Sequence, residues 1–304
     1  MKTVASAIRT TRATVCTALL LMIAAPHALA GEPINKRAAA PANGSVEISN
    51  TAGHVQVTGW DRNEVEVTGT LGKGADHLEF TSTGSVTRVQ VVLPSKAWHV
   101  EDSDLEVKIP LGSRLQVNTV SADIRAQGVQ GAQRLQSVSA NITTETAGDD
   151  VECKTVSGNV TVNGSGHKGL LTITTVSGDA VLNRVEGEVN VNTVSGNVTV
   201  GAGAMSRSRL RSTSGDLAVS SQLAADARYD VESISGGVRL ELAGPVSAEF
   251  DLSSFNGEIR SCFGPKAVRT SEYAPGKELR FTEGRGEARV RIRTMNGNIS
   301  LCKK

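Results

Sequence analysis

The sequence predicts an all-β protein, a single-domain repetitive β-solenoid in which short strands stack as in a parallel β-helix. Three observations support this class. A short block recurs nine times, apolar residues alternate with polar ones on both sides of a Ser-Gly turn, and only nine of the 304 residues are aromatic. Gly, Ser, Thr, Val and Asn dominate instead, which suits thin layers of β-branched residues joined by tight turns. The repeat leaves the handedness of the coil open.

Residues 1–30 have the pattern of a signal peptide. Lys2, Arg9 and Arg12 give a basic start, residues 13–25 are almost entirely apolar, and Ala28-Leu29-Ala30 offers a small-residue cleavage site. A membrane anchor would need about 20 apolar residues, more than this run provides. The chain is therefore expected to be exported, to the periplasm or to the cell surface and medium, with no transmembrane span after the signal is removed.

The remaining chain divides by its repeat. Residues 31–43, rich in Ala and Pro, are expected to be a flexible linker. Residues 44–304 are expected to form the solenoid, with weaker repeats over 44–113, regular repeats over 114–262, an excursion over 264–287 and a closing coil over 288–302. Removal of three of the 32 basic residues with the signal leaves 29 against 31 acidic ones, so a nucleic-acid partner is not expected.

The repeat aligns on the Ser or Asn that opens each turn, taken as position 0. These residues are Ser121, Ser139, Ser157, Ser177, Ser195, Ser214, Ser235, Asn256 and Asn296. Positions −4 and +3 are apolar in all nine copies, position −2 is Thr or Ser, and position +1 is Gly in seven copies and Ala in two. The alternation predicts one strand before the turn and one after it. Coils of 18–21 residues, stacked about 4.8 Å apart, would then bury a continuous core.

The Thr and Ser side chains at position −2 are expected to form a hydrogen-bonded ladder from coil to coil. Its threonines are Thr119, Thr155, Thr175, Thr193 and Thr294.

Several motifs resemble a known family. They are the Gly-x-Val-x-Val-x-Gly-Trp-Asp segment from Gly53 to Asp61, the repeated Thr-Val-Ser-Gly-Asn/Asp-Val blocks, and the closing Thr-Met-Asn-Gly-Asn-Ile-Ser-Leu from Thr294 to Leu301. Together they resemble the bacterial "putative adhesin" family, which is related to the head-domain adhesins of autotransporters. The resemblance covers about residues 44–302. It implies an exported β-solenoid without established catalytic residues.

Two stripes of arginine lie at the outward, odd offsets of the repeat: Arg207, Arg209 and Arg211 in one block, and Arg289, Arg291 and Arg293 in another. Such stripes could bind phosphates or acidic glycans, for which Arg is well suited. The better-supported interpretation is ion pairing between neighbouring coils. The expected pairs are Arg209–Asp230, Arg211–Glu232, Arg289–Glu249 and Arg291–Asp251, each contributing a few tenths of a kcal/mol up to about 1 kcal/mol.

Cys262 and Cys302 share offset +6 and are expected to form a disulfide, which export allows. Bridged Cα atoms must lie within about 7 Å, so the two coils have to be neighbours. This condition is why residues 264–287 are expected to leave the stack. Cys153 has the inward offset −4 and is expected to be a buried apolar residue.

No metal or cofactor site is expected, because the histidines are scattered and the acidic residues at offset +2 do not fall on adjacent coils. No catalytic residue is assigned. A carbohydrate-active β-helix enzyme is kept as an alternative, with Glu101, Asp102 and Asp104 beside Trp98 and His99 in the loop over 98–104. The leading function is a non-catalytic envelope protein, an adhesin or binding scaffold whose faces meet a partner or a glycan. A periplasmic accessory to envelope sensing is a further alternative.

Overall fold

The computed structural model describes residues 31–96 and 100–304, so the expected signal peptide lies outside the described residues. The described chain forms 22 strands joined by pairing, and it contains no helix. The predicted all-β class is therefore confirmed. Within residues 31–96 and 100–304 no helix is long and apolar enough to cross a bilayer.

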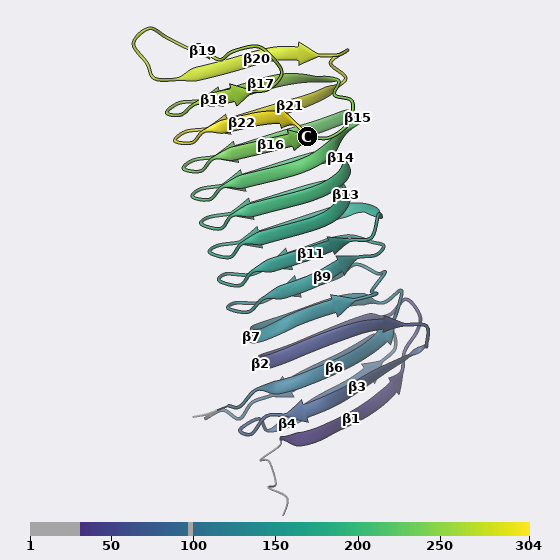
Figure 1. Ribbon diagram of the computed structural model, residues 1–304. Coiled ribbons are helices and arrows are strands. Elements are labelled where there is room, and N and C mark those ends of the chain that lie inside the picture. The colour runs from purple at the N-terminus through teal and green to yellow at the C-terminus, as the bar shows by residue number, and fades with distance from the viewer. Residues whose placement is uncertain (1–30, 97–99) are drawn as a thin grey trace, which may run out of the picture. The chain divides into compact units, whose positions relative to one another are not determined.

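The regular coils occupy the middle of the stack (Figure 1). Each coil has a strand before the tight turn, a strand after it, and a bend that leads to the next coil. In some coils two of these segments run on as one long strand, either through the bend or, at Ser121, through the turn itself. The strands are β7 (Arg114–Gln127), β8 (Gln133–Gln136), β9 (Ile142–Thr146), β10 (Val151–Lys154), β11 (Val160–Gly164), β12 (Lys168–Thr175), β13 (Ala180–Thr193), β14 (Val198–Ser212), β15 (Leu217–Ser233) and β16 (Val238–Leu242).

Neighbouring coils pair in parallel, and the repeat positions meet one another directly. The apolar residues at position +3 form one aligned column: Ile124, Ile142, Val160, Ala180, Val198, Leu217, Val238, Ile299 and Ile259. Those at position −4 form a second column across the core, and both columns are buried. The period-two alternation thus places its apolar residues inside.

The first part of the domain contains β1 (Glu32–Ala39), β2 (Ser45–Trp60), β3 (Glu64–Leu71), β4 (His77–Thr83), β5 (Val86–Val92) and β6 (Ser103–Pro110). β2 pairs with β7 in the register that the weaker repeat predicts, with Ile48 opposite Val117 and Val55 opposite Ile124. On its other side β2 pairs with β5 and β6, which come later in the chain. The first coil in sequence is therefore enclosed between two others (Figure 1).

Antiparallel strands cover this end of the stack. β4 pairs with β5, β3 pairs with β6, and β1 pairs with β3 over its full length. The prediction of a flexible linker over residues 31–43 is thus wrong, because most of that segment is strand β1. Its backbone completes the edge of β3, and Ile34 and Ala40 are buried. The Ala- and Pro-rich composition indicated a linker, but edge pairing and this small apolar contact decide otherwise.

The other end of the stack contains β17 (Ala248–Ser254), β18 (Ile259–Ser261), β19 (Val268–Arg269), β20 (Lys277–Glu283), β21 (Ala288–Thr294) and β22 (Ile299–Lys303). β21 pairs in parallel with both β15 and β17, and β22 pairs with both β16 and β18. The expectation that residues 288–302 close the stack is therefore wrong. The last coil in sequence lies inside, between its two predecessors (Figure 1).

Charge complementarity at offset −5 favours this insertion. With the last coil inserted, the residues at offset −5 alternate in charge across successive strands: Arg209, Asp230, Arg291 and Asp251. Arg280 of β20 then lies opposite Asp251. Opposite charges directly across neighbouring strands are stabilising. Stacking in chain order would instead have placed Asp230 beside Asp251. The segment between β16 and β17 leaves room for one coil between them, and β21 and β22 fill it.

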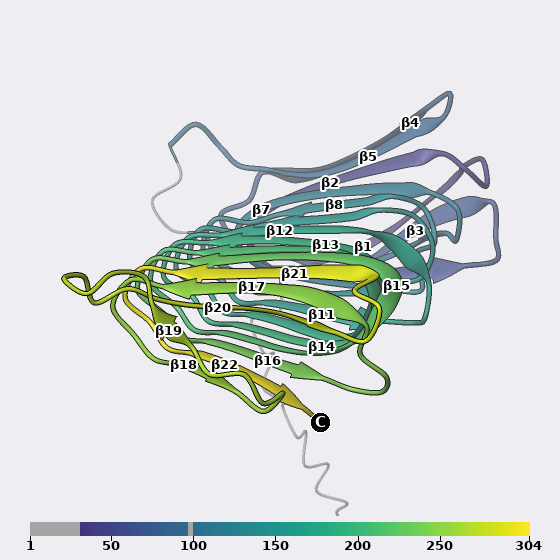
Figure 2. The same cartoon turned by 90° about the horizontal axis from the view of Figure 1, so that it is seen from above.

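Residues 264–287 form a hairpin-like arm and no parallel coil, in line with the excursion predicted there. β20 runs antiparallel along the outer edge of β17, and β19 pairs with β20. Phe250, Phe263 and Phe281 cluster beneath the arm, with ring centroids 4.7 to 5.8 Å apart. Seen from above, the tight turns of the coils gather along one edge, away from the bends (Figure 2).

Candidate functional site

The edge formed by the tight turns carries an exposed apolar column, which we call the apolar ridge. Its side chains occupy position −1 of eight of the nine repeat copies and are between 40% and 54% exposed. In stacking order they are Val120, Val138, Val156, Val176, Val194, Ile234, Met295 and Phe255. The ninth copy, between Val194 and Ile234, has Thr213 at this position. Contiguous apolar surface of this kind usually marks an interaction site in soluble proteins.

Hydrogen bonds between coils hold the ridge rigid. The carbonyl of each ridge residue accepts the N–H of the residue at position 0 in the next coil, as in Ser177 N–H to Val156 O and Ser195 N–H to Val176 O, both at 2.8 Å. The last steps of the series are Asn296 to Ile234 and Asn256 to Met295. Because β-branched Val also has few rotamers, the ridge would lose little entropy on binding.

A polar border runs beside the ridge. Position +2 is Asn or Asp in seven of the nine copies, and its side-chain oxygen accepts the backbone N–H at position +2 of the neighbouring coil at 2.8 to 3.1 Å. The acceptors are Asp123, Asn141, Asn159, Asp179, Asn197, Asp216 and Asn298. An apolar centre with a polar border is the usual anatomy of a protein interface.

The Thr column is buried at the turns, but most of its hydrogen bonds stay within one coil. The hydroxyls of Thr155, Thr175 and Thr193 accept the N–H of the glycine three residues later, at 3.0 to 3.1 Å. Thr119 donates to Ala122 O in its own turn, whereas Thr155 and Thr294 donate to the adjacent coil, to Ala140 O at 3.4 Å and Gly236 O at 3.3 Å. Ser137 and Ser254 at the same position also donate to the adjacent coil, to Val120 O and Gly297 O. The predicted coil-to-coil ladder is thus present at four of the nine positions. The Asn and Asp column forms a more regular ladder, with seven such bonds.

The four ion pairs expected between coils are present in the structure. Arg209 lies 4.0 Å from Asp230 and Arg211 lies 3.2 Å from Glu232. Arg289 lies 3.3 Å from Glu249, and Arg291 lies 3.5 Å from Asp251. All these arginines are at least 45% exposed, so solvent screens each pair and its contribution is about 1 kcal/mol or less.

Cys262 and Cys302 are joined by a disulfide, with their Cα atoms 4.8 Å apart. Insertion of the last coil makes them neighbours, because β18 pairs directly with β22. Cys153 is fully buried in the −4 column. Burial raises the pKa of its thiol to about 12, so the reactive thiolate is scarce at neutral pH.

We expect the protein purified from its native compartment to show one crosslinked peptide pair, Cys262 with Cys302. Iodoacetamide at pH 8 should leave Cys153 unmodified until the protein is unfolded, because the buried thiol is protonated and shielded. Non-reducing peptide mapping with and without denaturant measures both. Two free thiols at Cys262 and Cys302 would show that the bridge does not form.

The residues of the enzyme alternative do not form a common described site. Trp98 and His99 lie outside the described residues. Asp104 belongs to β6, and its Oδ1 lies 2.8 Å from Nδ1 of His54 on β2. The backbone N–H of Glu101 donates to Lys73 O, and the side chains of Glu101 and Asp102 face solvent.

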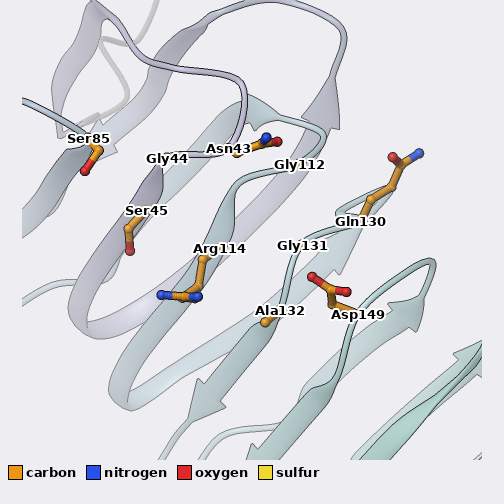
Figure 3. Close-up of a pocket in the computed structure, with 10 residues that line it drawn as sticks. All are labelled: Asn43, Gly44, Ser45, Ser85, Gly112, Arg114, Gln130, Gly131, Ala132 and Asp149. Atoms are coloured by element: carbon orange, nitrogen blue, oxygen red, sulfur yellow. The ribbon is translucent and has the colours of Figure 1, made fainter.

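A polar groove of about 460 Å³ lies where the first regular coils begin (Figure 3). Its charged side chains are Arg114 and Asp149, and Gln130 points away from the others in the close-up. Its floor contains Gly112 and Gly131, where a Cβ would collide with the neighbouring coil. The groove therefore follows from close backbone packing, and its polar side chains do not converge on one point.

A family model described as Toastrack DUF4097 matches residues 42–302. The chain belongs to this family. The match covers every coil of the stack and leaves out only the first described strand, β1. No curated protein is detectably similar to this Toastrack chain.

Solved structures extend the comparison. A "putative lipid binding protein" from Parabacteroides distasonis is 12% identical, with a TM-score of 0.51, over 90% of this chain and 97% of that one. A "putative adhesin" from Parabacteroides merdae is 11% identical, with a TM-score of 0.31, over 89% and 96%. A "putative cell adhesion protein" from Clostridium sporogenes is 9% identical, with a TM-score of 0.23, over 90% and 100%. The first shares the Toastrack fold, and the resemblance to the "putative adhesin" family is confirmed.

Two features of this Toastrack domain were not predicted above, although the repeat carries a pattern for each. Position −1 is apolar in eight copies although its odd offset faces solvent, which indicates a ridge. Position +2 is Asn or Asp in seven copies, which indicates a side-chain ladder. The apolar ridge is the candidate functional site.

Proposed function

We propose that this Toastrack protein is an exported, non-catalytic binding scaffold, and that it docks onto a protein partner of the cell envelope through the apolar ridge. The observation that carries the proposal is the alignment of eight half-exposed apolar side chains in one rigid column. Burying such side chains contributes about 25 cal/mol per Å² of apolar surface. The ridge therefore supplies a driving force for association that a single exposed residue lacks.

The chemistry of the border favours a protein over a glycan or a membrane. Glycan sites commonly use several aromatic side chains as platforms, and the ridge has one, Phe255 at its end. Acidic side chains, Asp123, Asp179 and Asp216, follow the ridge on one side and would be repelled by anionic lipid. An extended protein surface with an apolar centre and basic border complements both features.

The proposal includes one solenoid domain from residue 44 onward and export by the segment 1–30. The names adhesin and lipid binding protein given to solved relatives favour binding over catalysis. Turnover of a polysaccharide that is lost on changing Glu101, Asp102 or Asp104 would favour the enzyme alternative instead.

The ridge is tested by replacing Val156 or Val194 with the photo-crosslinking residue p-benzoylphenylalanine in intact cells. We expect one adduct of discrete mass from both ridge positions. The same residue at Asn192 or Thr199, exposed positions on the strands flanking the turn, should give none. Adding Val156→Asn and Val176→Asn should weaken the adduct formed from Val194, because the apolar contact shrinks. Equal adducts from all positions, no adduct, or an adduct of twice the chain's own mass would contradict the proposed partner.

Export is tested separately with an epitope-tagged chain. Release of the tag by osmotic shock, with protection from protease in intact cells, would place the partner in the periplasm. Cleavage of the tag on intact cells would place it at the cell surface. Retention of uncleaved protein in the cytoplasm would contradict export.

A further inference from the structure

A second feature of the stack lies on the strands before the turns, away from the apolar ridge. At offset −7, Arg207 of β14, Arg228 of β15 and Arg289 of β21 are direct partners across three neighbouring strands. Neighbouring strands are about 4.8 Å apart, and like charges directly opposite each other are destabilising. We call these three residues the arginine column.

The contrast with the adjacent column is informative. At offset −5 the same strands present Arg209, Asp230 and Arg291, so that charges of opposite sign alternate. The coil order that satisfies this column also brings Arg289 beside Arg228. Arg228 therefore has an arginine opposite it on both sides. A single acidic residue at position 228 would have removed this repulsion. Local rules of this kind are typically broken at functional sites.

Acidic residues neutralise only the two ends of the column. Arg207 pairs with Glu188 at 3.2 Å, and Arg289 pairs with Glu249 at 3.3 Å. The middle residue, Arg228, is exposed and forms no ion pair with any residue of the described chain. Its guanidinium therefore keeps all its donors available between two further cations.

The column borders a surface hollow of about 390 Å³. Its charged lining consists of five arginines and one acid: Arg207, Arg209, Arg228, Arg289, Arg291 and Asp230. Tyr229 lies beneath, with its hydroxyl 3.0 Å from Ser221 Oγ and donating to Gln222 O at 3.2 Å. This buried packing fixes the strand from which Arg228 projects, so the backbone positions of the arginine column are set before any ligand arrives.

We propose that the arginine column is an anion-binding site for a ligand that carries two or more phosphate or sulfate esters. The planar guanidinium matches such oxyanions in a bidentate manner. Three guanidiniums spaced along about 10 Å fit a polyanion better than a single carboxylate. Binding would neutralise the repulsion between the arginines, so the ligand should stabilise the fold. This site is independent of the partner proposed for the apolar ridge.

The test measures binding of sodium tripolyphosphate by calorimetry and the melting temperature of each variant. The wild-type protein should bind tripolyphosphate, and its melting temperature should rise on binding. Arg228→Gln should lower the affinity at least tenfold and should raise the melting temperature of the free protein, because repulsion is removed. Arg228→Glu should abolish binding and raise the melting temperature further, since Glu would pair with both neighbouring arginines.

Arg211→Gln is the matched control, because Arg211 lies on β14 outside the hollow and pairs with Glu232. It should leave the affinity within twofold and lower the melting temperature slightly. Equal affinity of wild-type and Arg228→Gln proteins would overturn the proposal. A lower melting temperature of Arg228→Gln would also overturn it, since Arg228 would then have a structural role.

Two further arms identify the source of the ester groups. Dextran sulfate, compared with neutral dextran, represents a charged glycan. Phosphatidylcholine vesicles with and without phosphatidic acid represent a lipid headgroup. Binding in either charged arm that Arg228→Gln abolishes supports the site and names its ligand class. Binding in both arms that Arg228→Gln leaves unchanged places the anion elsewhere on the protein and overturns the assignment.

Discussion

Deletion of residues 288–304 is expected to unfold the whole end of the domain from β17 onward, not only one coil. β21 and β22 are the strands through which β17 and β18 pair with the rest of the stack. Without them, the edges of β15 and β16 are left open and the β17–β20 arm has no parallel partner. In an ordinary solenoid the last coil would peel off alone, because each repeat contacts only its neighbours.

Hydrogen exchange measures this effect segment by segment. Amides of β17 and β20 should exchange at nearly unfolded rates in the deletion variant, while those of β9, β11 and β13 keep the protection of the intact domain. The deletion also removes Cys302, so the double variant Cys262→Ser, Cys302→Ser is the control. That control should keep β17 and β20 protected. Continued protection of β17 in the deletion variant would mean that this end is stable without the inserted coil.

Gly196→Ala is expected to destabilise the domain by about 3 kcal/mol or more. Gly196 lies at position +1 of its turn, and a Cβ there would penetrate the carbonyl group of Gly178 in the coil below. Gly178, Gly215 and Gly236 make the same close approach, each to the coil that precedes it. The coils cannot move apart at one turn without lengthening the hydrogen bonds between them. Overpacking against backbone is relieved less easily than overpacking against a flexible side chain.

Gly201→Ala provides a matched control from the same coil. Gly201 lies in β14, has no left-handed backbone angle, and a Cβ there would lie 3.6 Å from Leu182 O, an ordinary contact. The free energy of unfolding of the Gly201→Ala variant should differ from that of the wild-type protein by less than about 0.5 kcal/mol. Chemical denaturation of both variants, compared with the wild-type protein, checks the prediction. Similar stability of the Gly196→Ala and Gly201→Ala variants would show that the turns can separate.

Alanine does occupy position +1 in the first two regular copies, as Ala122 and Ala140. Both alanines are buried, and Ala140 accepts the close approach of Gly158 with its carbonyl oxygen. Their coils lie at the start of the regular series. In the middle of the stack, by contrast, glycine faces glycine from coil to coil.

The sequence alone determined the class of the fold and the register of its coils. Period-two alternation around a Ser-Gly turn specifies which residues face inward, and identical offsets must meet when coils stack. Hence the columns at Ile124 and Val117, the ion pair of Arg211 with Glu232, and the shared offset of Cys262 and Cys302 could all be inferred from spacing. These features depend on local pattern and on a single repeat length.

Only the tertiary structure decided the order of the coils and the edges of the stack. The apolar offsets of the seventh, eighth and ninth copies are equivalent, so the pattern fits either order. The structure places Arg291 between Asp230 and Asp251, where its charge is complementary on both sides. β1 likewise became a strand because the edge of β3 offered unpaired backbone groups. Long-range pairing of this kind carries no local periodicity, and the meeting of Arg228 with Arg289 depends on it in the same way. Repeat spacing alone therefore could not predict the insertion or the third member of the arginine column.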